Sequence, residues 1–218
     1  MIACFKPGLL AFMLACATFS APGATISNFT RAQFQLAVNG VSVTQQDFDL
    51  LSSGSTLGTL NGVTYSASGG TPLVTSTYLT TTGSNGLGST SVGFFQSTET
   101  ATFSFSSAIT AFAIDINTFA PTVGDYRATL NIGDIILSKF DVFPGTGTGQ
   151  FIGFTSNVAF SSITISTATN FAYTLDTLVY GDASRVADSA GIPEPSTWLS
   201  LAPGLLMLRY LRRRRSES

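Results

Sequence analysis

Apolar and polar side chains alternate one by one in several short segments, and this pattern restricts the fold of the chain more than any other feature. Residues 112–117 read Phe-Ala-Ile-Asp-Ile-Asn, and similar alternation occurs over 101–105, 128–132, 163–165 and 171–179. Successive side chains of a β-strand point to opposite faces, so alternation indicates strands with one buried face. The chain is therefore predicted to be rich in half-buried β-strands.

Turn signals made of Gly, Asn and Pro separate these segments at the spacing of an antiparallel fold. Between residues 25 and 191, 50 of the 167 residues are Ser or Thr, which suits strands with one solvent-exposed face. The predicted strands cover residues 41–48, 62–68, 73–79, 90–95, 99–106, 109–117, 126–132, 134–140, 150–155, 158–167 and 171–179. We predict an all-β domain over 25–181, folded as an antiparallel two-sheet sandwich of jelly-roll type.

One short helix is predicted near the start of this domain. Thr30 and Gln33 have the spacing of a capping box, in which each side chain satisfies a free backbone N–H of the other residue. An apolar stripe follows over 34–38, and Asn39 with Gly40 forms a stop signal. The helix is expected to pack against one edge or end of the sandwich.

The charged residues exclude several functions. The chain has no His, so it contains neither a Ser-His-Asp unit nor an imidazole metal ligand. Residues 25–191 carry four basic and ten acidic side chains, a net charge of −6. An acidic body disfavours nucleic acid as a partner, because phosphate binding needs a basic face.

The first 24 residues have the composition of a secretory signal peptide. Lys6 supplies the positive charge, 9–17 is an apolar run, and small residues follow up to Ala24. Both cysteines, Cys4 and Cys16, lie in this segment, so the exported chain would have no disulfide and no thiol nucleophile.

The C-terminal end has three parts after a small, polar linker over 182–191. They are the motif Pro193, Glu194 and Pro195, an apolar run over 199–208, and a stop of Arg212, Arg213, Arg214 and Arg215. The two prolines keep the motif extended and unable to pair in a sheet. The arginine cluster would hold the tail in the cytoplasm and leave the body outside the inner membrane.

This ending, together with the signal peptide, resembles the PEP-CTERM sorting signal of exported bacterial proteins over residues 192–215. The resemblance implies a membrane helix, recognition by an exosortase that cuts near the motif, and a Gram-negative host that makes exopolysaccharide. Residues 198–211 would form a helix of about 21 Å, shorter than the hydrocarbon core of roughly 30 Å. We therefore expect a transient membrane anchor and a final location in the cell envelope or outside the cell.

No catalytic site is recognisable. A glycosidase needs two carboxylates flanking the scissile bond, but Glu99 is the only Glu between residues 25 and 191, and Asp115 and Asp176 fall on the outward positions of their strands. These acids are interpreted as surface residues. The favoured function is a non-enzymatic structural or surface role associated with exopolysaccharide, and a secreted hydrolase is the least favoured alternative.

A structural calcium ion is the one cofactor considered. Asp47 and Asp49 near the first strand would meet Asp176 near the last, since first and last strands are often neighbours in sandwiches. Carboxylates and loop carbonyls suit calcium. The other reading is that all three are ordinary surface acids.

The main alternative function is a carbohydrate-binding module. The order of elements, ending in 149–156 and 173–181, is similar in outline to carbohydrate-binding jelly rolls. Tyr65, Tyr78 and Tyr126 are the candidates for an exposed aromatic platform. The threonine-rich run 75–82 is read as a solvated strand and loop rather than an ice-binding or adhesive face.

Overall fold

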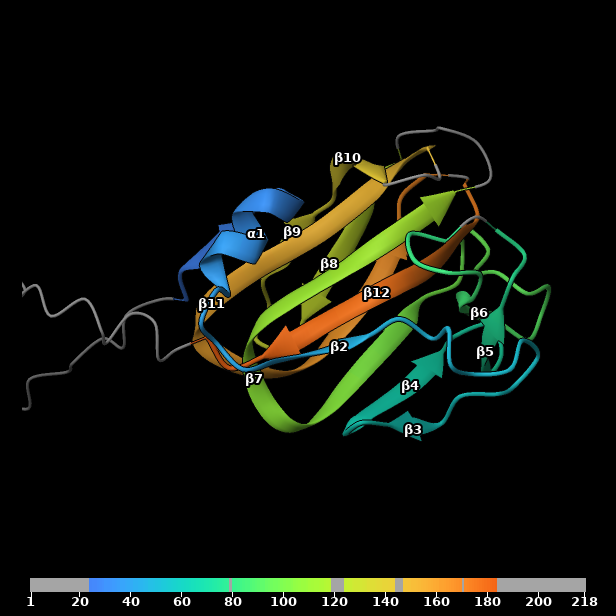
Figure 1. The fold of residues 1–218 in the computed structure, drawn as a ribbon, viewed down its shortest axis with the longest axis horizontal. Coiled ribbons are helices and arrows are strands. Elements are labelled where there is room, and N and C mark those ends of the chain that lie inside the picture. The colour runs from blue at the N-terminus through green and yellow to red at the C-terminus, as the bar shows by residue number, and fades with distance from the viewer. Residues whose placement is uncertain (1–23, 79, 119–123, 144–146, 170, 184–218) are drawn as a thin grey trace, which may run out of the picture.

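A computed structural model describes residues 24–78, 80–118, 124–143, 147–169 and 171–183 (Figure 1). The predicted sorting signal, nearly all of the predicted signal peptide and most of the predicted linker lie outside these residues. The elements are β1 (Ile26–Asn28), α1 (Arg31–Ala37), β2 (Val43–Gln46), β3 (Thr59–Leu60), β4 (Val63–Ala67), β5 (Pro72–Thr75), β6 (Gly86–Ser89), β7 (Ala101–Thr118), β8 (Tyr126–Leu130), β9 (Ile135–Leu137), β10 (Lys139–Phe143), β11 (Gly147–Thr167) and β12 (Tyr173–Gly181).

Two long strands, β7 and β11, bend back on themselves. The rings of Phe103 and Phe112 in β7 are 6.0 Å apart, although nine residues of straight strand would separate them by about 30 Å. The bend falls at the exposed residues 106–108. In β11 the rings of Phe154 and Phe160 are 5.5 Å apart, and the pairing with β7 shifts register in this region. Each strand therefore contributes one half to each of two facing layers.

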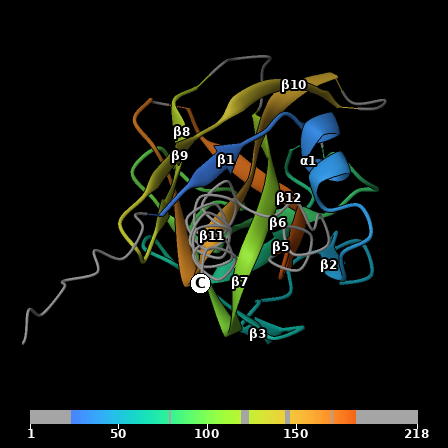
Figure 2. The same ribbon diagram turned by 90° about the vertical axis from the view of Figure 1, so that its left-hand side faces the viewer.

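The two layers are antiparallel sheets that share β7 and β11. In the first layer, residues 111–118 of β7 pair with residues 150–155 of β11. On the other side of β7 lies β12, and on the other side of β11 lies β10. The strands β1, β2, β5 and β6 extend this layer. In the second layer, residues 101–105 and 162–167 join β3, β4, β8 and β9. Figure 2 shows α1 and β2 on the side of the molecule opposite to β8 and β9. The described part of the chain is an antiparallel β-sandwich with one helix, α1.

The core lies between the layers and contains the apolar residues that alternation assigned to one face. Phe103, Ile114 and Ile163 are fully buried in it, as are Phe112 and Leu175. The outer face of the first layer is covered as well. Phe34 of α1 packs there against Ala111, Ala113 and Phe151. The first layer is thus buried on both faces beneath the helix.

The capping box is confirmed. Thr30 is the N-cap, its side chain accepts from the N–H of Gln33, and the Gln33 side chain accepts from the N–H of Thr30. Both groups satisfy donors that a helix of seven residues would otherwise expose.

Several strand predictions differ from the structure. The strands β1, β3 and β6 were not predicted, and the predicted strand 134–140 is divided between β9 and β10. The predicted strand at 90–95 is wrong: β6 ends at Ser89, where the N–H of Gly93, at φ +84°, closes a turn onto the Ser89 carbonyl. The two strands predicted at 99–106 and 109–117 are the two halves of the single strand β7. In the same way, the strands predicted at 150–155 and 158–167 are both part of β11. The short segments at the two bends look like turns in the sequence. The pairing of β7 with β11 shifts register there, but each strand continues beyond its bend into the other layer.

Candidate functional site

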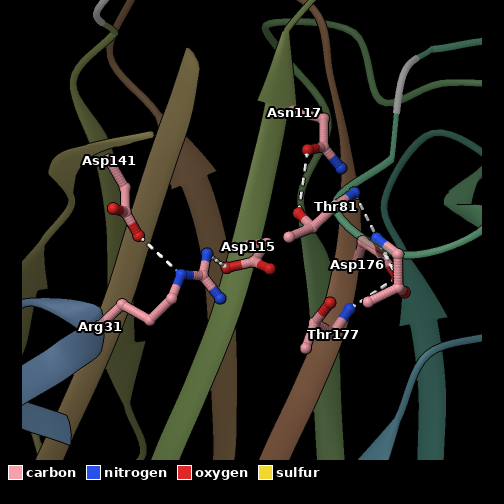
Figure 3. A network of polar contacts seen from close by, with 8 residues as sticks. Arg31, Thr81, Asp115, Asn117, Asp141, Asp176 and Thr177 are labelled. Carbon is pink, nitrogen blue, oxygen red and sulfur yellow. Dashed lines mark hydrogen bonds and ion pairs between the residues drawn. The ribbon is translucent and has the colours of Figure 1, made fainter. Parts of the chain in front are cut away.

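A polar cluster lies on the covered outer face of the first layer. Asp115 of β7 and Asp176 of β12 are direct partners across the two strands, and Asn117 pairs with Thr174 in the same way. All four side chains are buried, and both aspartates are completely so. The prediction that Asp115 and Asp176 are surface acids is wrong. They do occupy the outward positions of their strands, but α1 and the segment that joins β5 to β6 cover that face (Figure 3).

Arg31, at the start of α1, joins the helix to this face. Its Nη2 pairs with Oδ1 of Asp115, and its Nε donates to Oδ2 of Asp141 over 2.8 Å. The guanidinium also lies 4.8 Å from the ring centroid of Phe151, a cation–π contact. Burial disfavours the charge of Arg31, but the two carboxylates outweigh this effect and raise the pKa of its guanidinium. Arg31 therefore holds α1 on the sheet through β7, β10 and β11.

The charge on Asp115 is only partly compensated. Burial raises the pKa of Asp115, and Arg31 together with the hydroxyls of Thr81 and Thr177 acts in the opposite direction without cancelling it. Oδ2 of Asp115 has no hydrogen-bond partner. A completely buried carboxylate with one unpartnered oxygen is energetically expensive.

Asp176 anchors the segment between β5 and β6. Its Oδ2 accepts the backbone N–H groups of Thr81 and Thr82 over 2.8 and 2.9 Å, and its Oδ1 accepts that of Thr177 over 2.7 Å. Burial raises the pKa of Asp176 to about 7, because desolvation and the charge of Asp115 outweigh the donated hydrogen bonds.

A second aspartate holds the other end of the same segment. Oδ1 of Asp49 accepts the N–H groups of Ser84 and Asn85 over 2.8 and 3.0 Å. Oδ1 of Asp47 accepts the N–H of Asp49. Asp49 and Asp176 thus both accept backbone N–H groups of the segment between β5 and β6, one near each end of its second half.

The calcium site predicted from Asp47, Asp49 and Asp176 gains no support from this arrangement. Within the part of the chain that the structure describes, no three His, Cys, Asp or Glu side chains gather into a group that could hold a metal ion. The carboxylates of Asp49 and Asp176 are directed at backbone N–H groups instead.

Several buried polar atoms near Asp115 and Asp176 make no hydrogen bond. They are Oδ2 of Asp115, Oγ1 of Thr177, Nδ2 of Asn117 and Oγ1 of Thr174. Thr177 sits in a bulge of β12, where the pairing with β7 shifts register, and has a φ of +50°. Arg31, Asn117 and Thr177 were not recognised from the sequence as site residues. The available signal was Arg31 itself, one of only four basic residues between 25 and 191, placed directly after a helix cap.

The three tyrosines proposed as a sugar platform have different surroundings. Tyr65 and Tyr126 are buried in the core, so their predicted exposure is wrong. The rings of both residues fill the space between the layers. Tyr78 is half-buried and stacks on Phe94, with ring centroids 5.2 Å apart and 11° between the planes.

Of the described residues in the threonine-rich run 75–82, only Thr75 lies in a strand. Thr75 and Thr80 are buried, and Thr81 and Thr82 donate to Asp176. The predicted solvated strand and loop is thus largely a structural cover of the first layer.

The sorting motif of Pro193, Glu194 and Pro195 and the arginines 212–215 lie outside the described residues. Of the helices in the described part of the chain, none has the length and apolar character needed to cross a membrane.

No protein-family model and no curated protein matches the chain. Among solved structures, it is similar to three structures of family 29 carbohydrate-binding modules, two of them point variants made to probe ligand recognition. The sequence identities are 12, 10 and 12%, and the TM-scores are 0.34, 0.32 and 0.32. The matches cover 65, 65 and 66% of this chain and 96, 94 and 94% of those modules. Such low TM-scores carry no argument about the ligand of this chain.

Proposed function

We propose that this chain is an exported, non-enzymatic protein of the cell envelope or extracellular matrix. In this proposal the signal peptide directs export, and an exosortase recognises Pro193, Glu194 and Pro195. The apolar run and the arginine stop hold the chain transiently in the inner membrane, with the sandwich outside. The surface role is associated with exopolysaccharide, and the jelly-roll assignment of the sandwich is part of the same proposal.

The observation that supports display on a tether is the position of the two chain ends. Ser27 pairs with Thr155, Thr155 with Ala111, and Ala111 with Gly181, so these four residues lie side by side on neighbouring strands. Three strand spacings place Ser27 about 14 Å from Gly181. Both ends of the domain therefore leave from the same end of the sandwich, at the left in Figure 1.

The opposite end of the sandwich is left free by this arrangement. Tyr173 begins β12 at that end, about 27 Å from Gly181. A domain tethered through the residues that follow Gly181 presents the Tyr173 end away from the membrane.

A carbohydrate-binding module is the second candidate, and one observation favours it. The stacked pair of Tyr78 and Phe94 is half-buried and lies at the free end, where the neighbouring Phe95 pairs with Tyr173. Aromatic rings with one accessible face and a polar tip bind planar, partly apolar surfaces such as those of sugars.

The sorting proposal is tested in the native host with the variant Glu194→Ala. We expect the unchanged chain to end near residues 193–197 in the medium or envelope fraction, as measured by intact mass. The variant should keep its arginine tail and stay in the membrane fraction. Asp188→Asn in the predicted linker is the matched control and should be processed normally. Normal processing of Glu194→Ala would contradict the proposal.

The second candidate is tested with a polysaccharide panel and the processed chain. Saturable binding that is lost in Tyr78→Ala would favour a carbohydrate-binding module. Phe171→Ala is the control, because Phe171 is also a partly exposed aromatic residue, with 40% of its surface accessible. The absence of saturable binding would leave the structural role.

A further inference from the structure

The sandwich contains three Asn-Gly pairs, and the structure places them in different surroundings. They are Asn39-Gly40, Asn61-Gly62 and Asn85-Gly86. In such a pair the backbone nitrogen of the glycine can attack the side-chain amide carbon of the asparagine, because glycine has no Cβ to obstruct the approach. The new N–C bond closes a cyclic imide, the amide group leaves with the glycine N–H proton as ammonia, and water then opens the imide to aspartate or isoaspartate. The reaction needs a free side chain and a mobile backbone.

The pair Asn85-Gly86 is fixed by the fold. The side-chain amide of Asn85 donates to the carbonyl of Leu51 over 2.9 Å, and its backbone N–H donates to Oδ1 of Asp49 over 3.0 Å. Gly86 is buried at the start of β6, where it pairs with Thr75 of β5. Ring closure at this pair requires the hydrogen bonds of Asn85 and the end of the β5–β6 pairing to break together.

The pair Asn61-Gly62 lies at the surface but is also held. It forms the two-residue turn between β3 and β4, with φ of +50° and +79°. Nδ2 of Asn61 donates to Oε1 of Gln46 over 2.7 Å, and the carbonyl of Asn61 accepts from Oη of Tyr180 over 2.6 Å. The carbonyl of Gly62 accepts the N–H of Ser106 over 2.8 Å. Both the amide group and the backbone of this turn are therefore restrained.

The pair Asn39-Gly40 follows α1 and has fewer restraints. Both residues are exposed, and Gly40, at φ +81°, has open space where a Cβ would stand. The N–H of Asn39 donates to the carbonyl of Leu36 over 3.3 Å, at the end of a helix of seven residues. Within the described residues, no hydrogen bond involves the side chain of Asn39. The last turn of a short helix opens at little cost in free energy, so this backbone reaches the geometry of ring closure most readily.

We propose that Asn39 is a site of spontaneous deamidation, and that the fold protects Asn61 and Asn85 from the same reaction. The product carries a carboxylate at the C-terminal end of α1, where the helix dipole disfavours negative charge. In the isoaspartate product the backbone also runs through the former side chain, which lengthens the connection between α1 and β2. Modification therefore weakens the end of the helix that covers the outer face of the first layer. The inference does not depend on the sorting signal or on any ligand.

The test measures conversion at each pair in the chain purified from its host. The folded chain is incubated in mildly alkaline buffer, and peptide mapping by mass spectrometry follows the mass gained when an amide becomes an acid. We expect conversion at Asn39 to be at least about tenfold faster than at Asn61 and Asn85, because the other two must first lose their hydrogen bonds. In the chain unfolded by urea, the three rates should become similar, since the local sequences are alike.

Variants test whether hydrogen bonding provides the protection. Gln46→Ala removes the acceptor of the Asn61 side chain and should speed conversion at Asn61 by about fivefold, with Asn39 unaffected. Gln45→Ala, at the exposed neighbouring position on β2, is the matched control and should leave all three rates unchanged. Asn39→Gln keeps an amide but disfavours ring closure through its longer side chain, so conversion at this position should disappear.

Four outcomes would overturn the proposal. Equal rates at the three pairs in the folded chain would show that the fold does not discriminate among them. An Asn39 that stays unmodified in the folded chain but converts in urea would show that it is protected too. An unchanged rate at Asn61 in Gln46→Ala would remove the physical reason given for protection. Hydrogen exchange of α1 that is the same before and after conversion would contradict the weakening of the helix.

Discussion

The two faces of the first layer are both buried, yet they are stabilised in different ways. Along the second half of β7, alternate residues face the core and the covering helix, namely Phe112, Ile114 and Ile116 on one side and Ala113, Asp115 and Asn117 on the other. The inner face is mainly apolar and packs ring against ring, with Tyr173 and Tyr180 among its rings. The outer face mixes small apolar residues with carboxylates and amides under α1 and the segment between β5 and β6.

The difference shows that the two faces tolerate change unequally. Apolar burial is non-directional and scales with area, so the inner face depends on volume and close packing. The outer face depends on the partners of its two buried carboxylates, because an unpaired buried charge is expensive. Arg31 and the N–H groups of Thr81 and Thr82 supply those partners.

The largest expected effect is on the inner face. Phe112 contacts the rings of Phe103, Phe105 and Phe154 from both layers. Phe112→Ala should lower the free energy of unfolding by about 4 kcal/mol, through lost burial and a cavity. Chemical denaturation measures it, and Leu50→Ala, at a side chain 97% exposed, is the control with almost no effect. A loss below about 1 kcal/mol for Phe112→Ala would show that the two layers do not pack through this ring.

On the outer face, replacing Arg31 should lower the free energy of unfolding nearly as much as replacing Phe112 does on the inner face. Arg31→Met leaves Asp115 buried without its cation, and we expect a loss of about 3 kcal/mol in the free energy of unfolding. Adding Asp115→Asn should restore part of the loss, because the remaining charge is removed. The control Arg127→Met breaks the exposed ion pair with Asp125 and should change stability little. Equal losses of stability in Arg31→Met and Arg127→Met would contradict the claim that a covered ion pair matters more than an exposed one.

The stability contributed by the outer face should also depend on pH, whereas that of the inner face should not. The pKa of Asp176 is raised to about 7 in the folded chain, against about 4 when unfolded, so the folded state binds the proton more tightly. Stability should therefore fall as pH rises from about 4 to about 7 and then level off, with a loss of about 2 kcal/mol.

Asp176→Asn should flatten this profile, whereas Phe112→Ala should lower it without changing its shape. Chemical denaturation at a series of pH values provides the measurement. Stability that rises between pH 4 and 7 in the unchanged chain, and still does so in Asp176→Asn, would contradict the raised pKa.

The smallest expected effect is at the start of the covering helix. Thr30→Ala removes half of the capping box and should lower the free energy of unfolding by about 1 kcal/mol. Ser27→Ala, at an exposed position on β1, is the control. Hydrogen exchange should show faster exchange in α1 for Thr30→Ala, with β7 and β12 unaffected. No change in α1 would mean that Arg31 alone fixes the helix.

Much of the fold could be predicted from local patterns. Alternation identified the inward residues such as Phe103, Ile114 and Ile163, because strand geometry alone sets which side chains share a face. The capping box located α1 for a similar reason, since Thr30 and Gln33 satisfy each other without help from the rest of the chain. The bends of β7 and β11 were missed; in β7, the small exposed residues Ser106, Ser107 and Ala108 have the composition of a turn.

The candidate site could be predicted only in part. The outward placement of Asp115 and Asp176 was correct, but their exposure was not. Exposure depends on what lies above a strand, and here α1 and the segment between β5 and β6 approach from distant parts of the sequence. The partners of Asp115 are the clearest case, since Arg31 is 84 residues away in the chain.

The sequence by itself determined that this chain is a β-protein with one capped helix, no histidine and an acidic body, because these properties follow from residue type and from period along the chain. Tertiary structure alone decided which outward residues are covered and which polar atoms meet. Burial and pairing are relations between segments far apart in sequence, and one-dimensional periodicity contains no information about them. The Asp115 and Asp176 pair belongs to this second class.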